Sequence, residues 1–255
     1  MTGGDGTDAR WDGTSLSIEE HIENLRVEGV RLGTVADTTA FGAAIPGCPG
    51  WTLEDLVRHV GDVHRWAATI VRESLQERLR RDFVGPGNDA LLDWYAQGHR
   101  ELVQTLSDAS PRDEFWAWAP APNALAFWAR RQAHETAIHR LDAEQAGGSV
   151  TPFHAVQAAD GIDEWLTIAS RRVRSTSGGG RVLHLAPVDV PAAWMVGLEA
   201  EGLSLRNGEP AGRACTVRGP ASDLFALAMN RRHATGLVVE GDDDVLRAWR
   251  ESVHF

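Results

Sequence analysis

The stretch that most constrains the fold is Trp128 to Glu144, which reads WARRQAHETAIHRLDAE. It contains neither Pro nor Gly and is rich in Ala, Leu, Arg and Glu, residues that favour a helix. Because residues three and four apart share a helix face, an apolar stripe forms along it. The members of this stripe are Leu125, Trp128, Ala129, Ala133, Ala137 and Leu141. The sequence therefore predicts a long helix with one apolar side.

A second, polar stripe runs beside the apolar one. Its members are Arg131, Glu135, His139 and Asp142, at steps of four, four and three. A carboxylate and an imidazole one turn apart can bind a single metal ion, and Asp142 can then accept the free ring N–H of His139. The alternative is an amphipathic helix whose charged face is simply solvated. The spacing alone leaves both interpretations open.

The run His134-Glu135 followed by His139 looks superficially like the zinc-binding pattern HExxH, but the two histidines are five residues apart. Five residues turn a helix by about 500°, which leaves the two side chains about 140° apart. They cannot both bind one ion from a regular helix. The pair that fits is Glu135 with His139, and we expect His134 to serve in packing or as a helix cap.

Composition limits what such a helix can belong to. The chain has 255 residues, 43% of them hydrophobic, enough for one large domain or two modest ones. A net charge of −11 and a pI near 5.3 argue against a nucleic-acid partner. No apolar run approaches the roughly 20 residues of a membrane span, and no signal-peptide pattern opens the chain. We therefore expect a cytoplasmic protein without a membrane partner.

Cysteine and lysine usage further limit the class of protein and its host. Cys48 and Cys215 are far apart in sequence and imply no disulfide framework. Lysine is absent, so all basic side chains are Arg, beside abundant Ala and Gly. This bias indicates GC-rich coding, typical of an actinobacterial type of host.

The N-terminal part begins with residues 1–14, which are rich in Gly and Asp and are expected to form a disordered tail. Ser17 and Glu20 have the spacing of a capping box, which predicts a helix that continues to the vicinity of Ala44. The breaker segment 46–50 (PGCPG) ends it.

A second helix, capped by Thr52, carries His59 between Leu56 and Val63 at core spacing. A histidine in an apolar stripe needs a hydrogen-bond partner or a metal ion, and the ordinary outcome is a hydrogen-bonded core histidine. His64, on the same helix, competes for either role. His99 lies on the apolar stripe of a third helix, predicted from residue 88 or 89 to about 106, and is a further candidate.

Residues 107–122 form a linker that holds Trp116 and Trp118, which either line a site or cover the end of a helical bundle. After the central helix, another is expected from about Phe153 to Arg174, followed by the linker STSGGG at 175–180.

Beyond this linker the pattern changes to short strands and helices. Strands are predicted at 182–185, 194–196, 214–217 and 237–239, and helices at 220–231 and 242–251. The predicted fold is an antiparallel four-helix bundle over 15–175, followed by a small α/β domain over 181–255.

Three runs in this order resemble one family. They are Gly50-Trp51-Thr52 with Asp55-Leu56-Val57 and His59, then Arg131 with His134-Glu135 and His139-Arg140, and finally residues 159–166, ADGIDEWL. Together they resemble the mycothiol-dependent maleylpyruvate isomerase family. The resemblance implies a DinB-like metal-binding bundle, and a C-terminal domain similar to sterol carrier proteins.

The resemblance also implies a site. A divalent ion, usually zinc, is then held by His59, Glu135 and His139, with an open position for the thiol of mycothiol. A metal-bound thiol loses its proton readily and supplies thiolate at neutral pH. The family's second domain contributes an arginine, for which Arg231 and Arg232 are the candidates here. We take Arg231 and Arg131 as the candidate catalytic residues.

The implied reaction begins with addition of the thiolate to a small electrophilic substrate. In an isomerase the adduct rotates about the former double bond and eliminates the thiol. One alternative is a mycothiol S-transferase acting on another electrophile. A further alternative, from a different class, is a non-catalytic carrier of small apolar ligands, which requires neither metal nor thiol. The sequence does not indicate an oligomeric state.

Overall fold

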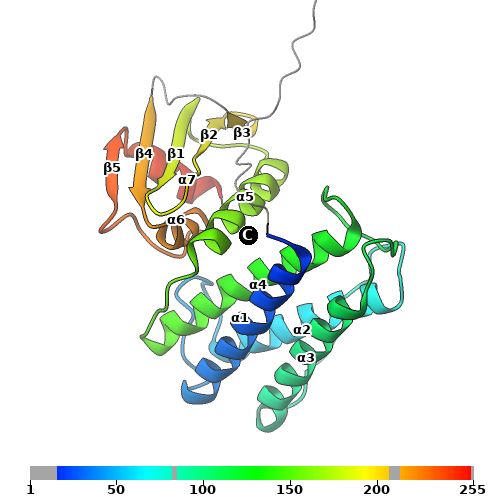
Figure 1. The fold of residues 1–255 in the computed structure, drawn as a ribbon. Coiled ribbons are helices and arrows are strands. Elements are labelled where there is room, and N and C mark those ends of the chain that lie inside the picture. Colours follow the sequence, from blue (N-terminus) through cyan, green and yellow to red (C-terminus); the bar gives the residue numbers. More distant parts are fainter. Residues whose placement is uncertain (1–15, 82–84, 207–212, 254–255) are drawn as a thin grey trace, which may run out of the picture. The chain divides into compact units, whose positions relative to one another are not determined.

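The computed structural model of the protein describes residues 16–81, 85–206 and 213–253 (Figure 1). The chain divides between Thr151 and Pro152 into two compact units. We call Leu16–Thr151 the helical unit and the residues from Pro152 onward the sheet unit. The predicted tail at 1–14 lies outside the described residues.

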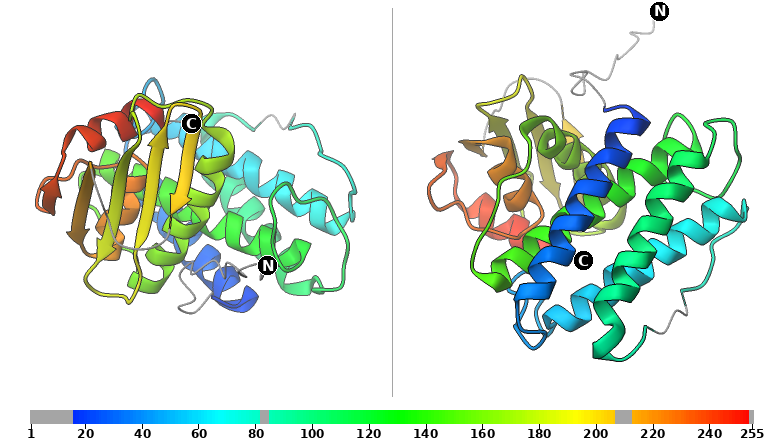
Figure 2. Two further views of the ribbon diagram at one scale, coloured as in Figure 1. Left: turned by 90° about the horizontal axis from the view of Figure 1, so that it is seen from above. Right: turned by 60° about the horizontal axis from the view of Figure 1, so that its bottom comes forward.

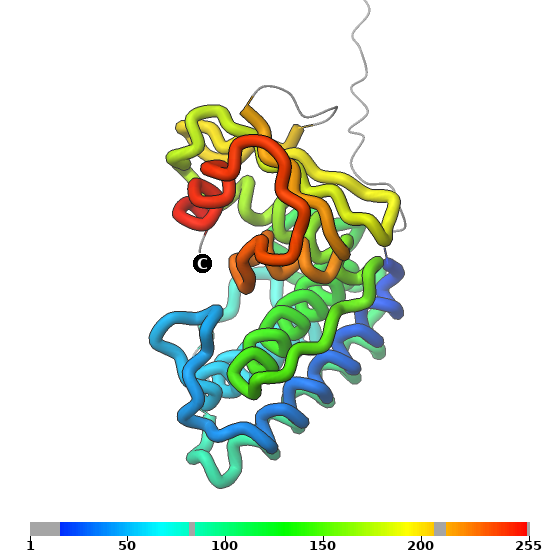
Figure 3. The backbone as a smooth tube through the Cα atoms, turned by 90° about the vertical axis from the view of Figure 1, so that its left-hand side faces the viewer, coloured from blue at the N-terminus to red at the C-terminus, as the bar shows by residue number. Residues whose placement is uncertain are grey.

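Four long helices build the helical unit (Figure 1; Figure 2, right). They are α1 (Ile18–Thr38), α2 (Leu53–Arg72), α3 (Leu91–Asp108) and α4 (Ala124–Gly147), with a short 3-10 helix η1 (Asn88–Ala90) before α3. α1 packs against α3 and α4, and α2 packs against the same two helices. In the tube view α1 (blue) runs alongside α4 (green) (Figure 3).

The first helix begins as predicted and ends earlier than predicted. The Ser17 hydroxyl accepts from the backbone N–H of Glu20, whose carboxylate accepts from the N–H of Ser17. The helix then stops at Thr38 rather than near Ala44, because the backbone becomes extended at Thr39. Ala44 instead forms an isolated bridge with Thr52, which closes a tight loop before α2.

α4 lies at the centre of the helical unit. Almost every residue from Leu125 to Glu144 is buried, polar ones included. The helix is therefore not a surface helix with a solvated charged face, and polar side chains such as Arg131, His139 and Arg140 have partners inside the protein. Its ends follow ordinary capping rules: Asn123 accepts from the N–H of Ala126, and Gly148 takes the left-handed conformation with φ of +80°.

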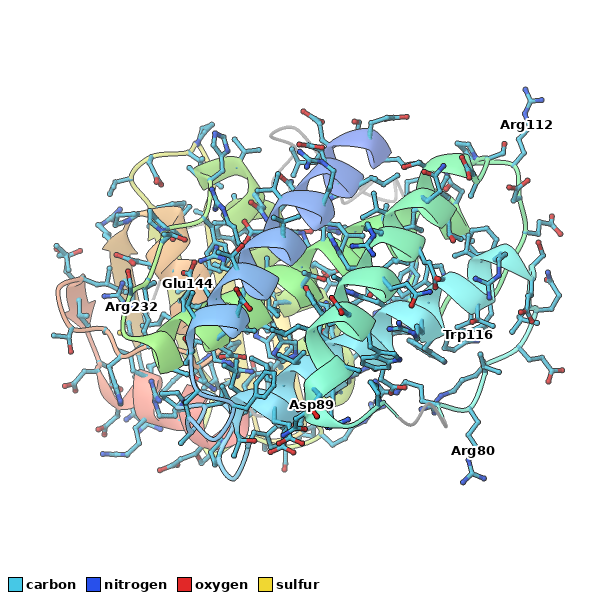
Figure 4. All side chains as sticks on the ribbon, turned by 90° about the horizontal axis from the view of Figure 1, so that it is seen from below. Arg80, Asp89, Arg112, Trp116, Glu144 and Arg232 are labelled. Atoms are coloured by element: carbon cyan, nitrogen blue, oxygen red, sulfur yellow. The ribbon has the colours of Figure 1, made fainter. Side chains whose placement is uncertain are left out.

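The tryptophans of the 107–122 connection belong to the core. Trp116 and Trp118 pack with Trp66, Phe127 and Trp128 in one aromatic group. The indole N–H of Trp128 donates to the carbonyl of Trp116. Of the two alternatives for these tryptophans, covering the end of the helices is the one observed. Arg80 and Arg112 lie in the same region as Trp116, and their side chains extend away from the helices (Figure 4).

The sheet unit contains one five-stranded sheet in the order β3-β2-β1-β4-β5 (Figure 2, left). Its elements are α5 (Ala155–Arg172), β1 (Arg181–Pro187), β2 (Trp194–Glu199), β3 (Gly202–Arg206), β4 (Ala214–Gly219), α6 (Ala221–Ala228), β5 (Val238–Gly241) and α7 (Asp244–Ser252). β1 and β4 pair in parallel and the other neighbours antiparallel. The sequence did not predict β3, whose residues are only partly buried.

The division between the units falls one helix earlier than the predicted linker at 175–180. α5 packs against α6 and β3, and the indole N–H of Trp165 donates to the carbonyl of Ala228 at 2.9 Å. These contacts place α5 in the sheet unit. The mixed helical and sheet architecture agrees with the predicted fold class, while the likeness to DinB and sterol carrier proteins stays a prediction. No helix in the described part of the chain is both long and apolar enough to cross a membrane.

Candidate metal centre

α2 and α4 bring together the three side chains that the sequence singled out. Nε2 of His59 lies 3.3 Å from Oε1 of Glu135, and Nε2 of His139 lies 3.4 Å from the same oxygen. All three donor atoms lie within 4.8 Å of one another. Glu135 and His139 meet because they are one helical turn apart, and His59 meets them because α2 packs against α4.

The spacing of these atoms suits a metal ion better than direct hydrogen bonds. Two donors about 2.05 and 2.1 Å from a tetrahedral zinc ion are about 3.4 Å apart. A charge-assisted N–H···O bond is shorter, about 2.7–2.9 Å. The observed 3.3 and 3.4 Å match the first value. The donor set of two imidazoles and one carboxylate therefore fits a divalent ion.

Solvent reaches this cluster from one side. The side chains of His59 and Glu135 are 24% and 21% exposed, whereas that of His139 is 8% exposed. Three protein donors with an accessible side leave room for a further ligand, which is the arrangement of catalytic rather than structural zinc sites.

Asp142 fixes the ring of His139. Its Oδ2 lies 2.9 Å from Nδ1 of His139, and the carboxylate is fully buried. When the ring is neutral and its proton lies on Nδ1, the lone pair of Nε2 points toward the cluster. Burial lowers the pKa of His139, but the hydrogen bonds to Asp142 and Glu135 outweigh it and raise the pKa to about 9. This is the contact that the step of three from His139 to Asp142 predicted.

Arg131 occupies the other oxygen of Glu135. Its Nη2 lies 2.5 Å from Oε2, one turn earlier on α4. Burial raises the pKa of Glu135, and the charge of Arg131 together with the two histidines outweighs it and lowers the pKa well below its usual value. Glu135 is therefore a carboxylate with Oε2 engaged and Oε1 directed at the histidines. Arg131 thus contacts the carboxylate of Glu135, one of the three donors of the cluster.

Sequence reasoning missed two neighbours of the cluster, both on the loop before α2. The ring of Trp51 stacks on His139 at an interplanar angle of 16° and lies 4.9 Å from the ring of His59. Sγ of Cys48 lies 3.6 Å from Oδ2 of Asp142. Trp51 stands eight residues before His59 in the quoted run, but nothing in the pattern shows that the loop folds back onto α4.

The remaining candidate histidines lie elsewhere. His134 is buried edge-on against His21, 5.6 Å between ring centroids, as a packing role predicts. Nε2 of His64 lies 2.8 Å from the hydroxyl of Thr136, and Nε2 of His99 lies 3.1 Å from the carbonyl of Leu25. None of these three joins His59, Glu135 and His139.

The two candidate arginines of the sheet unit differ in their surroundings. The guanidinium of Arg232 (labelled in Figure 4) pairs with Asp223 and donates to the carbonyls of His233 and Thr235. These contacts tie the segment after α6 together. Nη1 of Arg231 donates to the carbonyl of Met229 at 3.0 Å.

Residues 22–144 match the family described as the mycothiol maleylpyruvate isomerase N-terminal domain. No curated protein matches the chain. Among solved structures, the mycothiol-dependent maleylpyruvate isomerase is similar with 16% identity and a TM-score of 0.60, over 88% of this chain and 93% of that one. A histidine-to-alanine mutant of such an isomerase gives the same TM-score and coverage at 15% identity. At these identities the structural likeness shows a shared fold.

Proposed function

The chain carries the mycothiol maleylpyruvate isomerase N-terminal domain, and we propose that it is a metal-dependent enzyme with mycothiol as thiol cosubstrate. Its proposed reaction is addition of a thiolate to a small electrophile, as in the cis–trans isomerisation of maleylpyruvate. The observation that carries the proposal is the convergence of donor atoms from His59, Glu135 and His139 inside the matching segment.

We assign the metal site to these three side chains, with zinc as the best-suited ion for two imidazoles and one carboxylate. When bound, the ion lowers the pKa of a coordinated thiol and so supplies thiolate at neutral pH. The protein's part is to hold the donors still. Asp142 fixes the tautomer and orientation of His139, and Arg131 keeps Oε2 of Glu135 engaged so that Oε1 faces the histidines.

Trp51 covers one side of the two imidazole rings. An indole in this position excludes water from that side and leaves the exposed edge of His59 and Glu135 as the way in for thiol and substrate. We therefore assign Trp51 a role in shaping the approach to the metal site. This adds to the positioning that Asp142 and Arg131 provide.

We propose Arg231 as the side chain that binds the charge of a carboxylate substrate. Arginine suits this task because its planar guanidinium can donate two parallel hydrogen bonds to a carboxylate. Of the two arginines that follow α6, we assign this role to Arg231. Replacement of Arg231 is expected to raise KM or lower kcat/KM without a change in metal content.

The same donors would also serve a mycothiol S-transferase, because the reaction depends on the electrophile and not on the scaffold. Product analysis separates the two: the isomerase returns free mycothiol with a rearranged substrate, and the S-transferase consumes mycothiol. A carrier of small apolar ligands would show neither reaction and would need no metal.

The test is elemental analysis of protein purified without added metal, combined with a mycothiol-dependent assay on maleylpyruvate. The proposal expects about one divalent ion per chain if the site is tight. His59→Ala and His139→Ala should lose this ion and the activity while keeping the helical circular dichroism signal. His64→Gln is the matched control, a buried histidine of α2 outside the donor set, and should keep metal affinity within a factor of about ten. Full metal content in both alanine variants would contradict the assignment.

A further inference from the structure

A second set of donor atoms surrounds the other ring nitrogen of His139. Cys48, Asp142 and His139 each offer one atom, and these atoms lie within 4.8 Å of one another. Sγ of Cys48 lies 3.6 Å from Oδ2 of Asp142, which lies 2.9 Å from Nδ1 of His139. Asp142 is fully buried, whereas Cys48 is in no disulfide and is partly exposed, so a cation can reach the cluster past Cys48.

The spacing of this second set resembles the spacing of ligands around a bound ion. A thiolate sulfur about 2.3 Å and a carboxylate oxygen about 2.1 Å from a tetrahedral zinc ion are about 3.6 Å apart. The distance between Cys48 and Asp142 has this value. Both contacts are hydrogen bonds, with the Cys48 thiol donating to Oδ2 of Asp142, and the one between Asp142 and His139 must open by about half an ångström to admit an ion. The set thus needs one small adjustment.

We propose that Cys48, Asp142 and His139 form a second cation site, one that prefers thiolate-seeking ions such as Cd²⁺. Thiolate ligands select softer cations, whereas the set of His59, Glu135 and His139 offers only nitrogen and oxygen. The two sites share the imidazole of His139. The proposal that they compete therefore rests on the proposed function, while the existence of the second site does not.

The proton balance shows why occupation is exclusive. A neutral imidazole carries one proton, so only one of its nitrogens can bind an ion. When Nδ1 of His139 binds, the proton of Nδ1 is released to solvent, and the proton that stays on Nε2 donates to Oε1 of Glu135, 3.4 Å away. The thiol proton of Cys48 is released to solvent. An ion at the second site thereby removes His139 as a ligand of the first site and inhibits the proposed enzyme.

The experiment is a titration of the metal-free protein with Cd²⁺, read by the ultraviolet charge-transfer absorption of cadmium thiolate and by the bound cadmium per chain. The expected result is a charge-transfer band that saturates with one cation per chain. Cys48→Ala should remove the band, and Cys215→Ala, the matched control at the other cysteine, should retain it. Cys215 is fully buried in the sheet unit and belongs to neither donor set.

The variant His59→Ala separates this inference from the proposed function. It removes a donor of the first site only, so the cadmium band should persist while the zinc content of the purified protein falls. Persistence of zinc in His59→Ala would count against the proposed function alone. A wild-type protein that binds Cd²⁺ without the band, a band that survives in Cys48→Ala, or two cations bound at once would overturn the second site as described.

Discussion

Glu135 presents its two carboxylate oxygens to different partners, and this division sets the chemistry of the centre. Oε2 is held by Arg131 at 2.5 Å, and Oε1 faces the nitrogens of His59 and His139. A carboxylate with one oxygen engaged in this way can offer only the other to an ion. Under the proposed function, this keeps the coordination number of the ion low and leaves a position for an incoming thiol.

Replacement of Arg131 tests this division. Arg131→Met removes the partner of Oε2, and we expect metal affinity to change by about 10–100-fold, the range found when a group that orients a metal ligand is lost. Arg131→Lys keeps the charge but not the planar geometry, so its metal affinity should lie between those of the wild type and Arg131→Met. Competition with a chelator of known affinity measures the change. Equal affinities in all three proteins would mean that Arg131 does not orient Glu135.

At the scale of helices, α1 and α3 approach closely where the sequence places Gly29. A Cβ at this position would lie 2.2 Å from Nε2 of His99. The close approach lets His99 reach the carbonyl of Leu25 and lets the hydroxyl of Tyr95 donate to the carbonyl of Gly29 at 2.9 Å. The glycine thus permits two buried polar side chains to find backbone partners.

Gly29→Ala should therefore destabilise the protein although alanine favours a helix. The added methyl group forces the ring of His99 out of place, at a cost of about 1–3 kcal/mol. Gly33→Ala, one turn later on α1, is the control, since its Cβ would lie 3.4 Å from Tyr95. That change should be neutral or stabilising by up to about 1 kcal/mol. Urea unfolding measures both, and equal midpoints would contradict the expected clash.

α1 and α4 are also joined by a buried ionic network. Arg140 is fully buried, and its guanidinium bonds Glu28 on α1, Glu144 on its own helix and the carbonyl of Thr151. Glu144 in turn accepts from the backbone N–H and the hydroxyl of Thr151. The network fixes α1 against α4 and holds the chain as it leaves the helical unit.

Arg140→Met should cost about 3–5 kcal/mol of unfolding free energy, because Glu28 and Glu144 stay buried after their ion pairs with Arg140 are lost. The double change Glu28→Gln with Arg140→Met removes one of these charges and should recover part of the loss. Denaturant unfolding at low and high salt is the measurement. Since buried pairs are little screened, the cost should persist at high salt. A cost that vanishes in salt would mean that the network is solvent-exposed.

Much of the helical unit follows from local signals. The capping boxes at Ser17 and Thr52 determine where two helices begin, and the steps from Glu135 to His139 and Asp142 predict contacts that the structure contains. Local sequence signals do not predict contacts between residues that are far apart in the chain. The position of Cys48 beside Asp142, ninety-four residues later, depends on how the loop before α2 packs against α4.

Non-local contacts also explain where the structure differs from the sequence-based predictions. The end of α1 was misplaced because Ala44 pairs with Thr52, a contact outside the helix. The burial of the polar stripe on α4 could not be read from its spacing, because a charged stripe looks alike whether water or another helix faces it. β3 was missed because its pattern is short and half-exposed, and pairing with β2 makes it a strand.

At the scale of the whole molecule, two buried histidines make stability depend on pH. Burial, followed by His99 and Arg65, lowers the pKa of His64 well below 6.5, against an opposing effect of Glu135. Burial also lowers the pKa of His99, although its bond to the carbonyl of Leu25 opposes this. Both side chains are therefore neutral in the folded protein at neutral pH.

Unfolding exposes these histidines, which then take up protons below about pH 6.5. At His64 and His99 the unfolded chain binds more protons than the folded one in this range, so their contribution to the unfolding free energy falls as the pH falls. His139, with a pKa of about 9 in the folded protein, acts in the opposite direction. The slope is at most about 1.4 kcal/mol per pH unit for each histidine, and it flattens below the folded pKa values. His99→Gln should reduce the slope between pH 6.5 and 5.5.

All the donors of the candidate centre, and the residues that orient them, lie within the helical unit, and the family match covers residues 22–144 of it. The residues of the candidate centre are thus encoded by one continuous segment of the gene. Mutations that accumulate in the sheet unit leave its ligand set intact. Under the proposed function, changes in the sheet unit can alter which substrate is used while the metal ligands in the helical unit stay the same.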